Sequence, residues 1–520
     1  MLEIQGFLTP NVEAKCKGFL KRMKKSLHLG AMIMYQNNEN QLVLPDDFFL
    51  PFGGKLNKNN RWVTLAELIP WWKVEEQYTQ SFKSTFRGQK AVSVRTALGA
   101  LIIKERLELS DRETVQQITE NPYLQYFIGL PRFTEEAPFH HSLMTHFRKG
   151  LGKDIINEVN EWVVMGDSDS RDDSDDNLPG GGSSTESHSE DQPSETETHH
   201  GKLLLDATCA PADIKYPTDL ELLNEGREKL EHIIDVLHAP HRGDQPKPRT
   251  YRKRARKEYL KIAKQRRPKA RKIRKAVGQQ LRFVKRNLGI IADLAEKTPL
   301  TRLTNQEYKQ LLVIQELYRQ QKEMYDNRSH RIDDRIVSIS QPHVRPIVRG
   351  KTKAPVEFGA KIAASVVDGY VMMEKLGWDN FNEALDLQTS VEAYRKRYGC
   401  YPEAVLADQI YRNRENRRYC KDLGIRLSGP PLGRPSKHDQ AELKRQAKLD
   451  AAERNEIEGT FGKAKRHRGL GLIQARLQET SETVIALQFL VMNLDRKLRF
   501  LFWIFVRCIF KSRSKFILAV

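Results

Sequence analysis

The stretch GKLLLDATCAP, residues 201–211, decides how the rest of the chain is interpreted. Leu203, Leu204 and Leu205 form an apolar run that is too short for a helix and does not alternate, which predicts a central strand covered on both faces. Asp206 follows this run, and we expect it at the exit of the strand, delivered into a site. An Asp after an apolar run is more often a turn former or a helix cap, so this stretch alone leaves both roles open.

The composition indicates a basic globular protein. The chain has 520 residues, 39% of them hydrophobic, which gives room for two or three domains. Lys and Arg number 87 against 67 Asp and Glu, and the formal charge of +20 favours a polyanionic partner, with nucleic acid first. The five cysteines contain no CxxC pair, so neither a disulfide framework nor a zinc site is indicated.

Neither end of the chain predicts a membrane segment. The first 34 residues contain several lysines and lack the apolar core of a signal peptide, so we expect a cytoplasmic protein. Residues 498–510, LRFLFWIFVRCIF, are strongly apolar, but Arg499 and Arg507 interrupt them and they fall short of the roughly 20 residues that span a bilayer. We therefore expect segment 498–520 to be an apolar helix packed on protein, followed by a tail.

The first half of the chain predicts a helical unit. Residues 1–43 show little pattern and are interpreted as an extension, whereas helical signals dominate a unit that spans residues 44–165. Within it Ser110–Glu113, SDRE, is a capping box that opens a helix. Such a unit can hold a helix-turn-helix that binds DNA, and an ordinary bundle with a solvated basic face is an equal alternative. The candidate contacts are Arg132, His146, Arg148 and Lys149.

Residues 166–200 predict a disordered linker. They contain eleven acids, one Arg and almost no apolar side chains, so they cannot bury enough surface to fold. The paired His199 and His200 are interpreted as part of the linker rather than as metal ligands.

The most basic stretch follows a predicted helix at residues 217–238. Residues 249–286 hold eighteen Lys and Arg against one acid, Glu258. Such a run is usually a solvated helix face, but its cations repel one another unless a polyanion neutralises them, so we interpret it as a DNA contact. The cations chosen to represent it are Arg266, Arg267, Arg271 and Lys272.

The second half alternates strand and helix signals. A helix in residues 382–399 is expected to end at Gly399 as a C-cap. AVLADQIY, residues 404–411, repeats the opening pattern, a short apolar strand that ends on Asp408. Alternating strands and helices imply an α/β fold with a mixed sheet flanked by helices and with ligands at the strand ends. Further strands are expected in 335–340, 344–351, 357–373 and 425–431, and a further helix runs from 413 to 424.

A closing helix contributes a third acid, Glu458. Arg454, Glu458, Phe461 and Lys465 are spaced by four, three and four residues, so they lie along one helix face with an acid between two cations. This pattern fits a salt-bridged surface helix, the commoner case, and it equally suits a helix that lies along a phosphate backbone.

Three blocks of the sequence are similar to those of a known family. LLLDATCAPADIKYPTD, AVLADQIYRNRENRRYC and RNEIEGTFGKAK resemble the signature blocks of bacterial insertion-sequence transposases of the Asp-Asp-Glu (DDE) type, specifically the insertion-sequence family five group. LPFGGKL, NRWVTLAELIPW, LSDRETVQQITENPYLQYFIGL and HFRKGLG resemble the helical N-terminal domain of that group. Because the similarity begins near MYQNNENQ, Met34 is a second candidate start, with residues 1–33 dispensable.

The resemblance implies a ribonuclease-H-like catalytic domain at residues 201–497, with a basic helical insertion at 217–327. It also implies that Asp206, Asp408 and Glu458 are catalytic and hold two divalent ions, Mg²⁺ or Mn²⁺. Carboxylates suit these hard cations, and two ions about 3.5–4 Å apart stabilise the attacking and leaving oxygens of a displacement at phosphorus.

The closing signature of the family is Tyr, Arg, Glu and Lys at fixed spacing. Arg454, Glu458 and Lys465 match it, and the resemblance implies that the two cations contact DNA. Ala451 stands at the Tyr position, which leaves the metal ligands intact and puts in doubt the contact that the Tyr makes.

The function implied is that of a DDE transposase, an enzyme of DNA recombination. It would bind the terminal inverted repeats of its insertion sequence, cleave DNA and transfer the strands to target DNA, as a nucleoid-associated homodimer on paired ends and without a membrane partner. Two alternatives remain: a metal-dependent nuclease or resolvase with the same core, and a DNA-binding descendant that no longer cuts.

Overall fold

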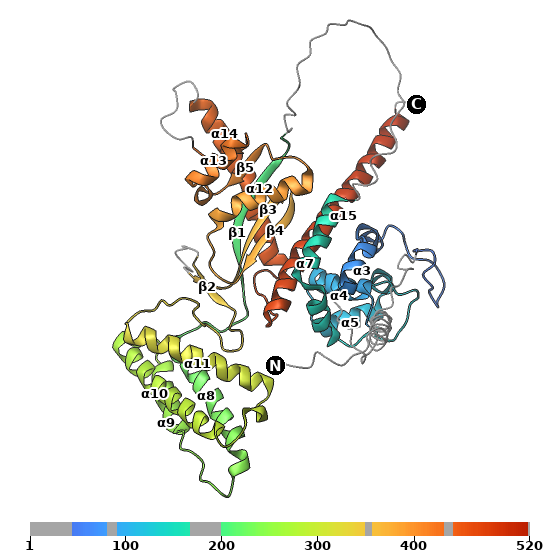
Figure 1. The fold of residues 1–520 in the computed structure, drawn as a ribbon. Coiled ribbons are helices and arrows are strands. Elements are labelled where there is room, and N and C mark those ends of the chain that lie inside the picture. Colours follow the sequence, from blue (N-terminus) through green and yellow to red (C-terminus); the bar gives the residue numbers. More distant parts are fainter. Residues whose placement is uncertain (1–43, 81–90, 167–198, 349–355, 431–439, 518–520) are drawn as a thin grey trace, which may run out of the picture.

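The structure is a computed structural model and describes residues 44–80, 91–166, 199–348, 356–430 and 440–517. Figure 1 shows three parts, which are a helical unit from the first part of the chain, a sheet with flanking helices, and a second helical unit beyond the end of the sheet. The predicted extension 1–43 with Met34, and nearly all of the predicted linker 166–200, lie outside the described residues.

The N-terminal helices pack around one apolar core. The capping box is confirmed, because Ser110 Oγ accepts from the Glu113 backbone N–H at 3.2 Å and Glu113 Oε2 accepts from the Ser110 N–H at 2.9 Å. The last helix bends at Gly152, which has a φ of 60°. The helices are α2 (Arg61–Leu68), α3 (Trp71–Gln80), α4 (Val94–Leu107), α5 (Asp111–Glu120), α6 (Pro122–Phe127) and α7 (Leu143–Met165).

The sheet is mixed, with strand order β2-β3-β1-β5-β6 and β4 paired to β3. β1 runs antiparallel to β3 and parallel to β5. The predicted central strand is confirmed, because Leu203 and Leu205 are buried on one face and Leu204 is buried on the other. The strands are β1 (Lys202–Pro211), β2 (Arg345–Val348), β3 (Val356–Val367), β4 (Tyr370–Gly377), β5 (Ala404–Ala407) and β6 (Arg426–Leu427).

The expected place of Asp206 at the exit of the strand is wrong. β1 continues to Pro211, because its antiparallel pairing with β3 runs the full length from Leu204. Only the parallel pairing with β5 stops before the acid, at Leu205. Asp206 therefore lies in the middle of β1, where one of its two neighbouring strands ends.

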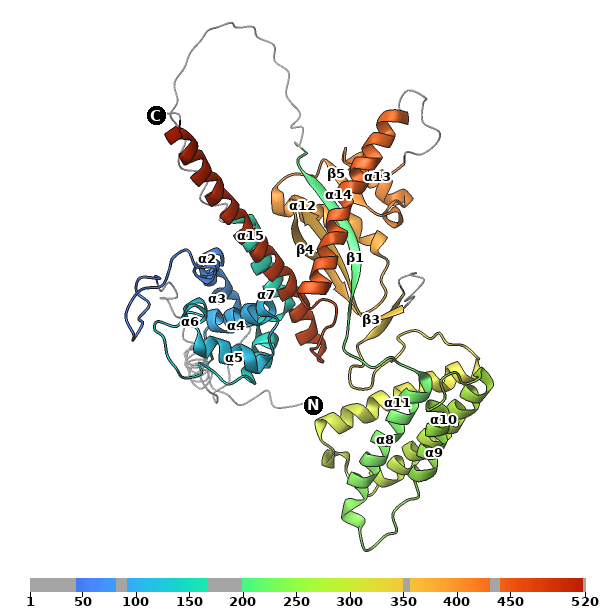
Figure 2. The ribbon, with the colours of Figure 1, turned by 180° about the vertical axis from the view of Figure 1, so that it is seen from behind.

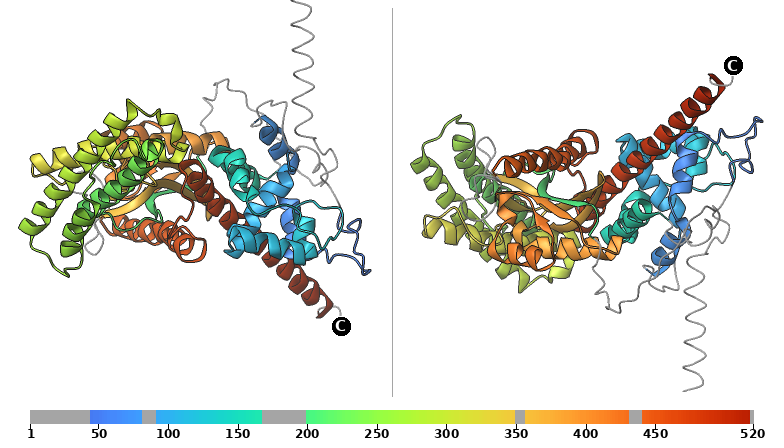
Figure 3. Two further views of the ribbon diagram at one scale, coloured as in Figure 1. Left: turned by 90° about the horizontal axis from the view of Figure 1, so that it is seen from below. Right: turned by 90° about the horizontal axis from the view of Figure 1, so that it is seen from above.

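Helices cover both faces of the sheet (Figure 3). α12 (Leu387–Tyr398) and α13 (Arg414–Asp422) cover one face, and α12 ends at Gly399 in the left-handed conformation, as predicted. α14 (Gln440–His467) and α15 (Gln478–Ile517) lie on the other face, and Figure 2 shows α14 crossing β1. Short 3-10 turns, η4 (Glu383–Asp386) and η5 (Gln409–Tyr411), precede α12 and follow β5.

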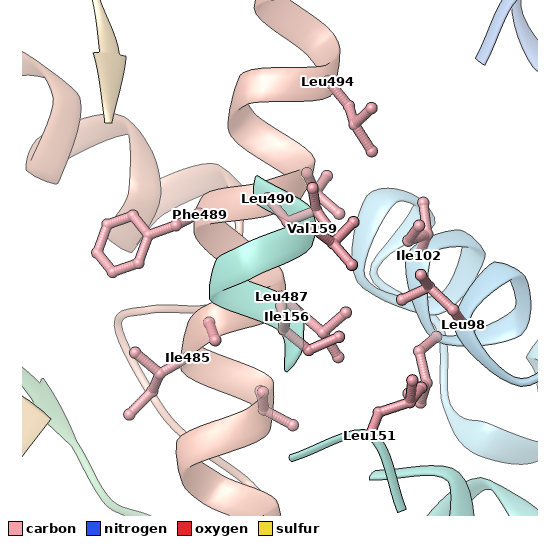
Figure 4. Close-up of a cluster of buried hydrophobic side chains, with 14 of the residues drawn as sticks. Leu98, Ile102, Leu151, Ile156, Val159, Ile485, Leu487, Phe489, Leu490 and Leu494 are labelled. Atoms are coloured by element: carbon pink, nitrogen blue, oxygen red, sulfur yellow. The ribbon is translucent and has the colours of Figure 1, made fainter. Parts of the chain in front are cut away.

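α15 joins the N-terminal helices to the sheet. Figure 4 shows Leu98 and Ile102 of α4, Ile156 and Val159 of α7, and Leu490 of α15 packed in one cluster. Two buried amides extend this contact to the sheet, because Asn493 Nδ2 donates to Asn160 Oδ1 at 2.8 Å and to the Val371 carbonyl of β4 at 2.7 Å. The N-terminal helices and this face of the sheet thus share one core.

The packing predicted for the apolar C-terminal segment is wrong. The segment is helical, as expected, but Phe500, Leu501, Phe502 and Trp503 are 39–68% exposed where α15 extends beyond the body of the molecule (Figure 1). Within the described ranges no helix is long and apolar enough to cross a membrane.

The second helical unit lies between β1 and β2 in the sequence and has its own core. The strand predicted at residues 335–340 is wrong, because Ile336 and Ile339 enter this core while Val337 faces the other one. The Ile336 N–H donates to the side chain of Gln320 at 2.9 Å and not to a strand. The helices are α8 (Asp219–His238), η2 (Ala239–His241), α9 (Arg252–Ala263), α10 (Ala270–Ala295), η3 (Leu300–Arg302) and α11 (Asn305–Asp326).

Candidate active site

Strand register brings Asp206 and Asp408 together. β1 and β5 are parallel, and Leu205 lies opposite Ala407, so Asp206 and Asp408 are the residues that follow this pair on the two chains. Asp408 Oδ1 accepts from the Gln409 N–H at 2.7 Å, which caps the turn that follows β5. The parallel pairing of β1 with β5, and the end of β5 at Ala407, therefore make these two carboxylates neighbours.

Asp206 is the electrostatically perturbed member of the site. Burial raises its pKa to about 6, and the N–H of Ala207, 2.8 Å from Asp206 Oδ1, opposes this effect. The negative charges of Glu383, Asp408 and Glu458 raise the pKa further. A cation bound beside Asp206 would offset this repulsion.

Glu458 reaches this region because α14 is anchored along its length. Ile457 and Phe461 are buried against the sheet on the side next to Glu458. Three ion pairs tie the same helix to three strands, so its rotation is fixed. They are Lys202–Glu453 at 2.8 Å, Arg426–Asp450 at 2.7 Å and Lys465–Glu357 at 4.0 Å.

Arg454 lies between two of the acids. Its Nη1 is 3.0 Å from Asp408 Oδ1, and its Nη2 is 3.7 Å from Glu458 Oε1. In the part of the chain that the structure describes, no group of three or more His, Cys, Asp or Glu side chains is placed to hold a metal ion. The guanidinium of Arg454 is the positive charge between these two acids, and both carboxylates are more than half exposed.

The donor set suits a hard divalent cation. Carboxylate oxygens are the ligands that Mg²⁺ and Mn²⁺ prefer, and an excess of acids over cations is what such an ion neutralises. Glu456, two residues before Glu458 on α14, is not among the main causes of the raised pKa of Asp206. It lines a different pocket, together with Lys463 and Arg496.

Sequence reasoning missed Glu383. It lies in η4, and the segment that contains it was interpreted only as a helix. No periodicity or spacing relates it to the other acids, and only the packing of η4 against η5 reveals the proximity. A Glu at the start of a helix has a common explanation in the helix dipole, which hides any further role.

The four cations chosen from the basic run are not brought to the acids. Arg266, Arg267, Arg271 and Lys272 are exposed at the junction of α9 and α10, in the helical unit with its separate core. Among the described residues, Arg252 is the only cation of that run with a carboxylate within 4 Å, that of Asp235 at 2.8 Å.

One candidate contact of the N-terminal helices is wrong. Arg148 is 8% exposed and donates two hydrogen bonds to Asp111, at 3.0 and 2.6 Å, so it is committed inside the unit. Arg132, His146 and Lys149 are exposed.

Two families of known proteins match separate parts of the chain. A family described as "Transposase DDE domain" matches residues 405–495, which contain Asp408 and Glu458. A second family, "Transposase domain (DUF772)", matches residues 51–150 of the N-terminal helices. The mixed sheet flanked by helices is consistent with a ribonuclease-H-like DDE domain, a family that uses divalent metal ions.

A protein of Rhizobium meliloti described as "Uncharacterized protein ORF8 in nfe locus" is 35% identical over 104 residues, which are 20% of this chain and 49% of that protein. The chain thus spans about half the length of this curated relative. No solved structure matches. The two transposase families match the N-terminal helices and the region of two of the three acids, and both matches support a DDE-type insertion-sequence transposase.

Proposed function

We propose that the protein is a DNA transposase that binds the ends of its insertion sequence, cleaves DNA there and joins the ends to target DNA. The observation that carries this proposal is the convergence of Asp206 from β1, Asp408 from the turn after β5 and Glu458 from α14, in a chain of this family. The finer assignment to the insertion-sequence family five group rests on the signature blocks alone.

Asp206, Asp408 and Glu458 would hold the metal ions and are the catalytic residues of this proposal. Two Mg²⁺ or Mn²⁺ ions bound there would supply an activated water, later an activated DNA 3′-hydroxyl, and stabilisation of the leaving oxygen. With a pKa of about 6, Asp206 is mostly ionised at pH 7 and available as a ligand.

Arg454 has a second role in the same proposal. Once the acids have another cation, the guanidinium loses its two partners while its helix stays in place. An Arg in that position suits the bidentate binding of a DNA phosphate beside the scissile bond. Lys465 lies about three helical turns after Arg454 on α14, where it pairs with Glu357. It is proposed to contact the same DNA backbone.

DNA binding beyond the site is assigned to two units. The helical insertion at residues 217–327, with Arg266, Arg267, Arg271 and Lys272 on its surface, would neutralise phosphates without reading sequence. The N-terminal helical domain, residues 44–165, would recognise the terminal repeats. A homodimer on paired ends follows from the need to join two ends to one target.

The test is a strand-transfer assay with the full-length chain. Sequencing the DNA that flanks the gene gives the terminal inverted repeats, and linear DNA with these ends is mixed with a supercoiled target and Mg²⁺. The proposal expects cut ends joined to the target, and neither product with Glu458→Gln. Cleavage without joining would instead identify a nuclease or resolvase, and binding without cleavage a descendant that no longer cuts.

A further inference from the structure

A groove of about 420 Å³ lies between α14 and α15, which cover the same face of the sheet. The residues of α14 that line it follow one another at intervals of four, so they form one row along the helix, and they include Asn455, Gly459, Lys463 and His467. Glu458 immediately precedes Gly459 but does not line the groove. The groove therefore runs along the face of α14 next to the one that carries the acids.

The groove is positively charged. Lys463 lines it from α14, and Arg496 and Arg499 line it from α15. Among the described residues no carboxylate lies within 4 Å of any of these three side chains. Lys463 and Arg499 are exposed. Cations on two facing helices thus share one groove without an acidic partner of their own.

Two acids also line the groove, and they do not balance its charge. Asp495 accepts from Arg106 at 2.8 Å and pairs with Arg468, so its charge is already compensated. Glu456 is exposed, and no cation of the described ranges lies within 4 Å of it. The cations of the two helices therefore exceed the one acid that has no partner.

The turn between β3 and β4 holds Arg496 in position. The Nη2 of Arg496 donates to the Asp368 carbonyl, and its guanidinium lies 5.2 Å from the centre of the Tyr370 ring. Gly369, at a φ of 74°, leaves the space for this contact, because a Cβ there would lie 2.0 Å from the guanidinium carbon. A guanidinium has five N–H donors, so one fixed in this way keeps others for an acceptor in the groove.

The length of the groove suits an extended polyanion better than a single small anion. The row from Asn455 to His467 spans about 18 Å of helix, at 1.5 Å per residue. One strand of B-DNA presents a phosphate about every 3.4 Å along its axis, so several phosphates fit beside this row. The space above Gly459 is open, because a Cβ there would meet no atom within 4 Å.

We propose that the groove between α14 and α15 binds the phosphate backbone of DNA through Lys463, Arg496 and Arg499, an inference that rests on the proposed function. Because Glu458 lies on the adjacent face of α14, DNA in the groove would pass beside the acids. The ends of the insertion sequence and the target DNA present the same backbone, so the two sources are distinguished by experiment.

The experiment places a photo-crosslinking side chain, p-benzoylphenylalanine, at position 459 of the full-length chain, where the space is open. The protein is irradiated in EDTA with end DNA, with a target duplex, or with both, and the crosslinked nucleotides are mapped. We expect crosslinks to DNA. Crosslinks to end DNA assign the groove to the ends, and crosslinks to the target duplex alone assign it to target DNA.

A double variant removes the charge of the groove. Lys463→Gln with Arg499→Gln is expected to abolish the crosslink and to lower the slope of log affinity against log salt by roughly two, at about 0.9 per phosphate contact. Arg319→Gln with Lys322→Gln is the matched control, because it removes the same charge from two ion-paired cations of α11. The control is expected to keep both the crosslink and the salt slope.

Two results would overturn the inference. One is a crosslink from position 459 only to protein while DNA is bound, which would identify an occupant from the chain itself, such as the acidic residues 167–197. The other is a DNA crosslink and a salt slope that the folded double variant leaves unchanged. If the double variant unfolds at a lower temperature than the natural protein, Lys463→Gln and Arg499→Gln are measured singly, each with an expected change in slope of about 0.9.

The crosslink in EDTA does not depend on cleavage, which separates this inference from the proposed function. A chain that joins ends to target DNA but gives no DNA crosslink from position 459 would reject the groove and keep the transposase. A chain that crosslinks DNA there but neither cleaves nor joins it would keep the groove and reject the transposase.

Discussion

The sheet with α14 and the helical unit α8–α11 both carry many cations, but they neutralise them differently. At the sheet, cations meet acids of the same chain: Lys202 pairs with Glu453, and Arg454 lies between Asp408 and Glu458. At the junction of α9 and α10 the cations are exposed, and among the described residues of the basic run only Arg252 has a carboxylate within 4 Å. Ion pairs within the chain hold side chains in position. Exposed cations without an acidic partner favour the binding of an external polyanion.

This difference assigns DNA cleavage to the acids at the sheet and DNA affinity to the exposed cations of the helical unit. Strand register and the anchoring of α14 position the acids. Single changes of these acids are therefore expected to lower the rate of DNA cleavage and to leave DNA affinity unchanged. The exposed cations would each add one similar phosphate contact. Changes there are therefore expected to alter DNA affinity and its salt dependence and to leave the cleavage reaction unchanged.

The largest effect is expected from the three acids. Asp206→Asn, Asp408→Asn and Glu458→Gln should each lower the rate of Mg²⁺-dependent cleavage of end DNA by more than about 100-fold. Loss of a residue that only supports a metal ligand costs about 10- to 100-fold, and loss of the ligand itself should cost more. Binding of the same DNA, measured by fluorescence anisotropy in EDTA, should change little. Glu456→Gln is the control and should cleave normally. Cleavage retained by Glu458→Gln but lost by Glu456→Gln would show that the wrong acid of α14 was chosen.

The next effect is expected from the exposed cations. Replacing Arg266, Arg267, Arg271 and Lys272 with Gln should flatten the slope of log affinity against log salt by roughly two to four, at about 0.9 per phosphate contact. Affinity should fall about equally for end DNA and for unrelated DNA, because phosphate contacts carry no sequence information.

A matched pair of variants sharpens the salt prediction. Arg319 and Lys322 of α11 are ion-paired within their own helix, Arg319 to Glu316 at 2.7 Å. Replacing both with Gln should leave the salt slope nearly unchanged, whereas Arg266→Gln with Arg267→Gln should lower it. Equal slopes for the two pairs would mean that the basic run is a solvated face or is screened by another acidic partner, such as residues 167–197 of the same chain.

A smaller effect is expected in the pH dependence of stability. The pKa of Asp206 is about 6 in the folded protein against an ordinary 3.8, so ionisation disfavours the fold. Its contribution to stability is fully present below pH 4 and is lost as the pH rises through about 6, by at most about 3 kcal/mol. Asp206→Asn should remove this loss in EDTA and be the more stable protein at pH 7, as urea unfolding at pH 4 and pH 7 will show. If the stabilities of the natural protein and of Asp206→Asn change in parallel between pH 4 and pH 7, the raised pKa of Asp206 is contradicted.

The smallest effect is expected from the counter-charge. Arg454→Gln removes the cation that lies between Asp408 and Glu458, and Mn²⁺ binding without DNA should tighten by roughly two- to tenfold, the scale of about 1 kcal/mol for charges near 4 Å in a well-solvated site. Arg418→Gln, which breaks an exposed ion pair of the same i,i+4 type with Asp422, is the control and should have no effect. Weaker Mn²⁺ binding by Arg454→Gln would show that the arginine supports the site instead of competing for it.

Sequence alone predicted those parts of the fold that depend on local pattern. The strand at Leu203–Leu205, the capping box at Ser110 and the C-cap at Gly399 each follow from chemistry within a few residues. The packing of η4 against η5 depends on Asn416 of α13, which donates to the carbonyls of Ala384 and Tyr411, and no local pattern encodes these contacts.

The wrong predictions share one physical cause, which is that a pattern of apolar residues does not identify what covers them. Residues 335–340 contain three apolar side chains because two cores take them, Ile336 and Ile339 in one and Val337 in the other. Phe502 and Trp503 belong to an apolar helix, as expected, yet both side chains are more than half exposed. Asp206 lies in the middle of its strand because β3 continues where β5 stops.

The most direct test of the account is to locate the bound metal along the chain. Fe²⁺ bound in place of Mg²⁺, with ascorbate and peroxide, generates hydroxyl radicals that cut the nearby backbone, and the fragments can be mapped by mass spectrometry. The account predicts cuts near residues 206, 408 and 458 together, none in α9 or α10, and loss of all three in Asp206→Asn. Cuts confined to one of the three segments, or cuts that persist in Asp206→Asn, would contradict the claim that these acids form one metal site.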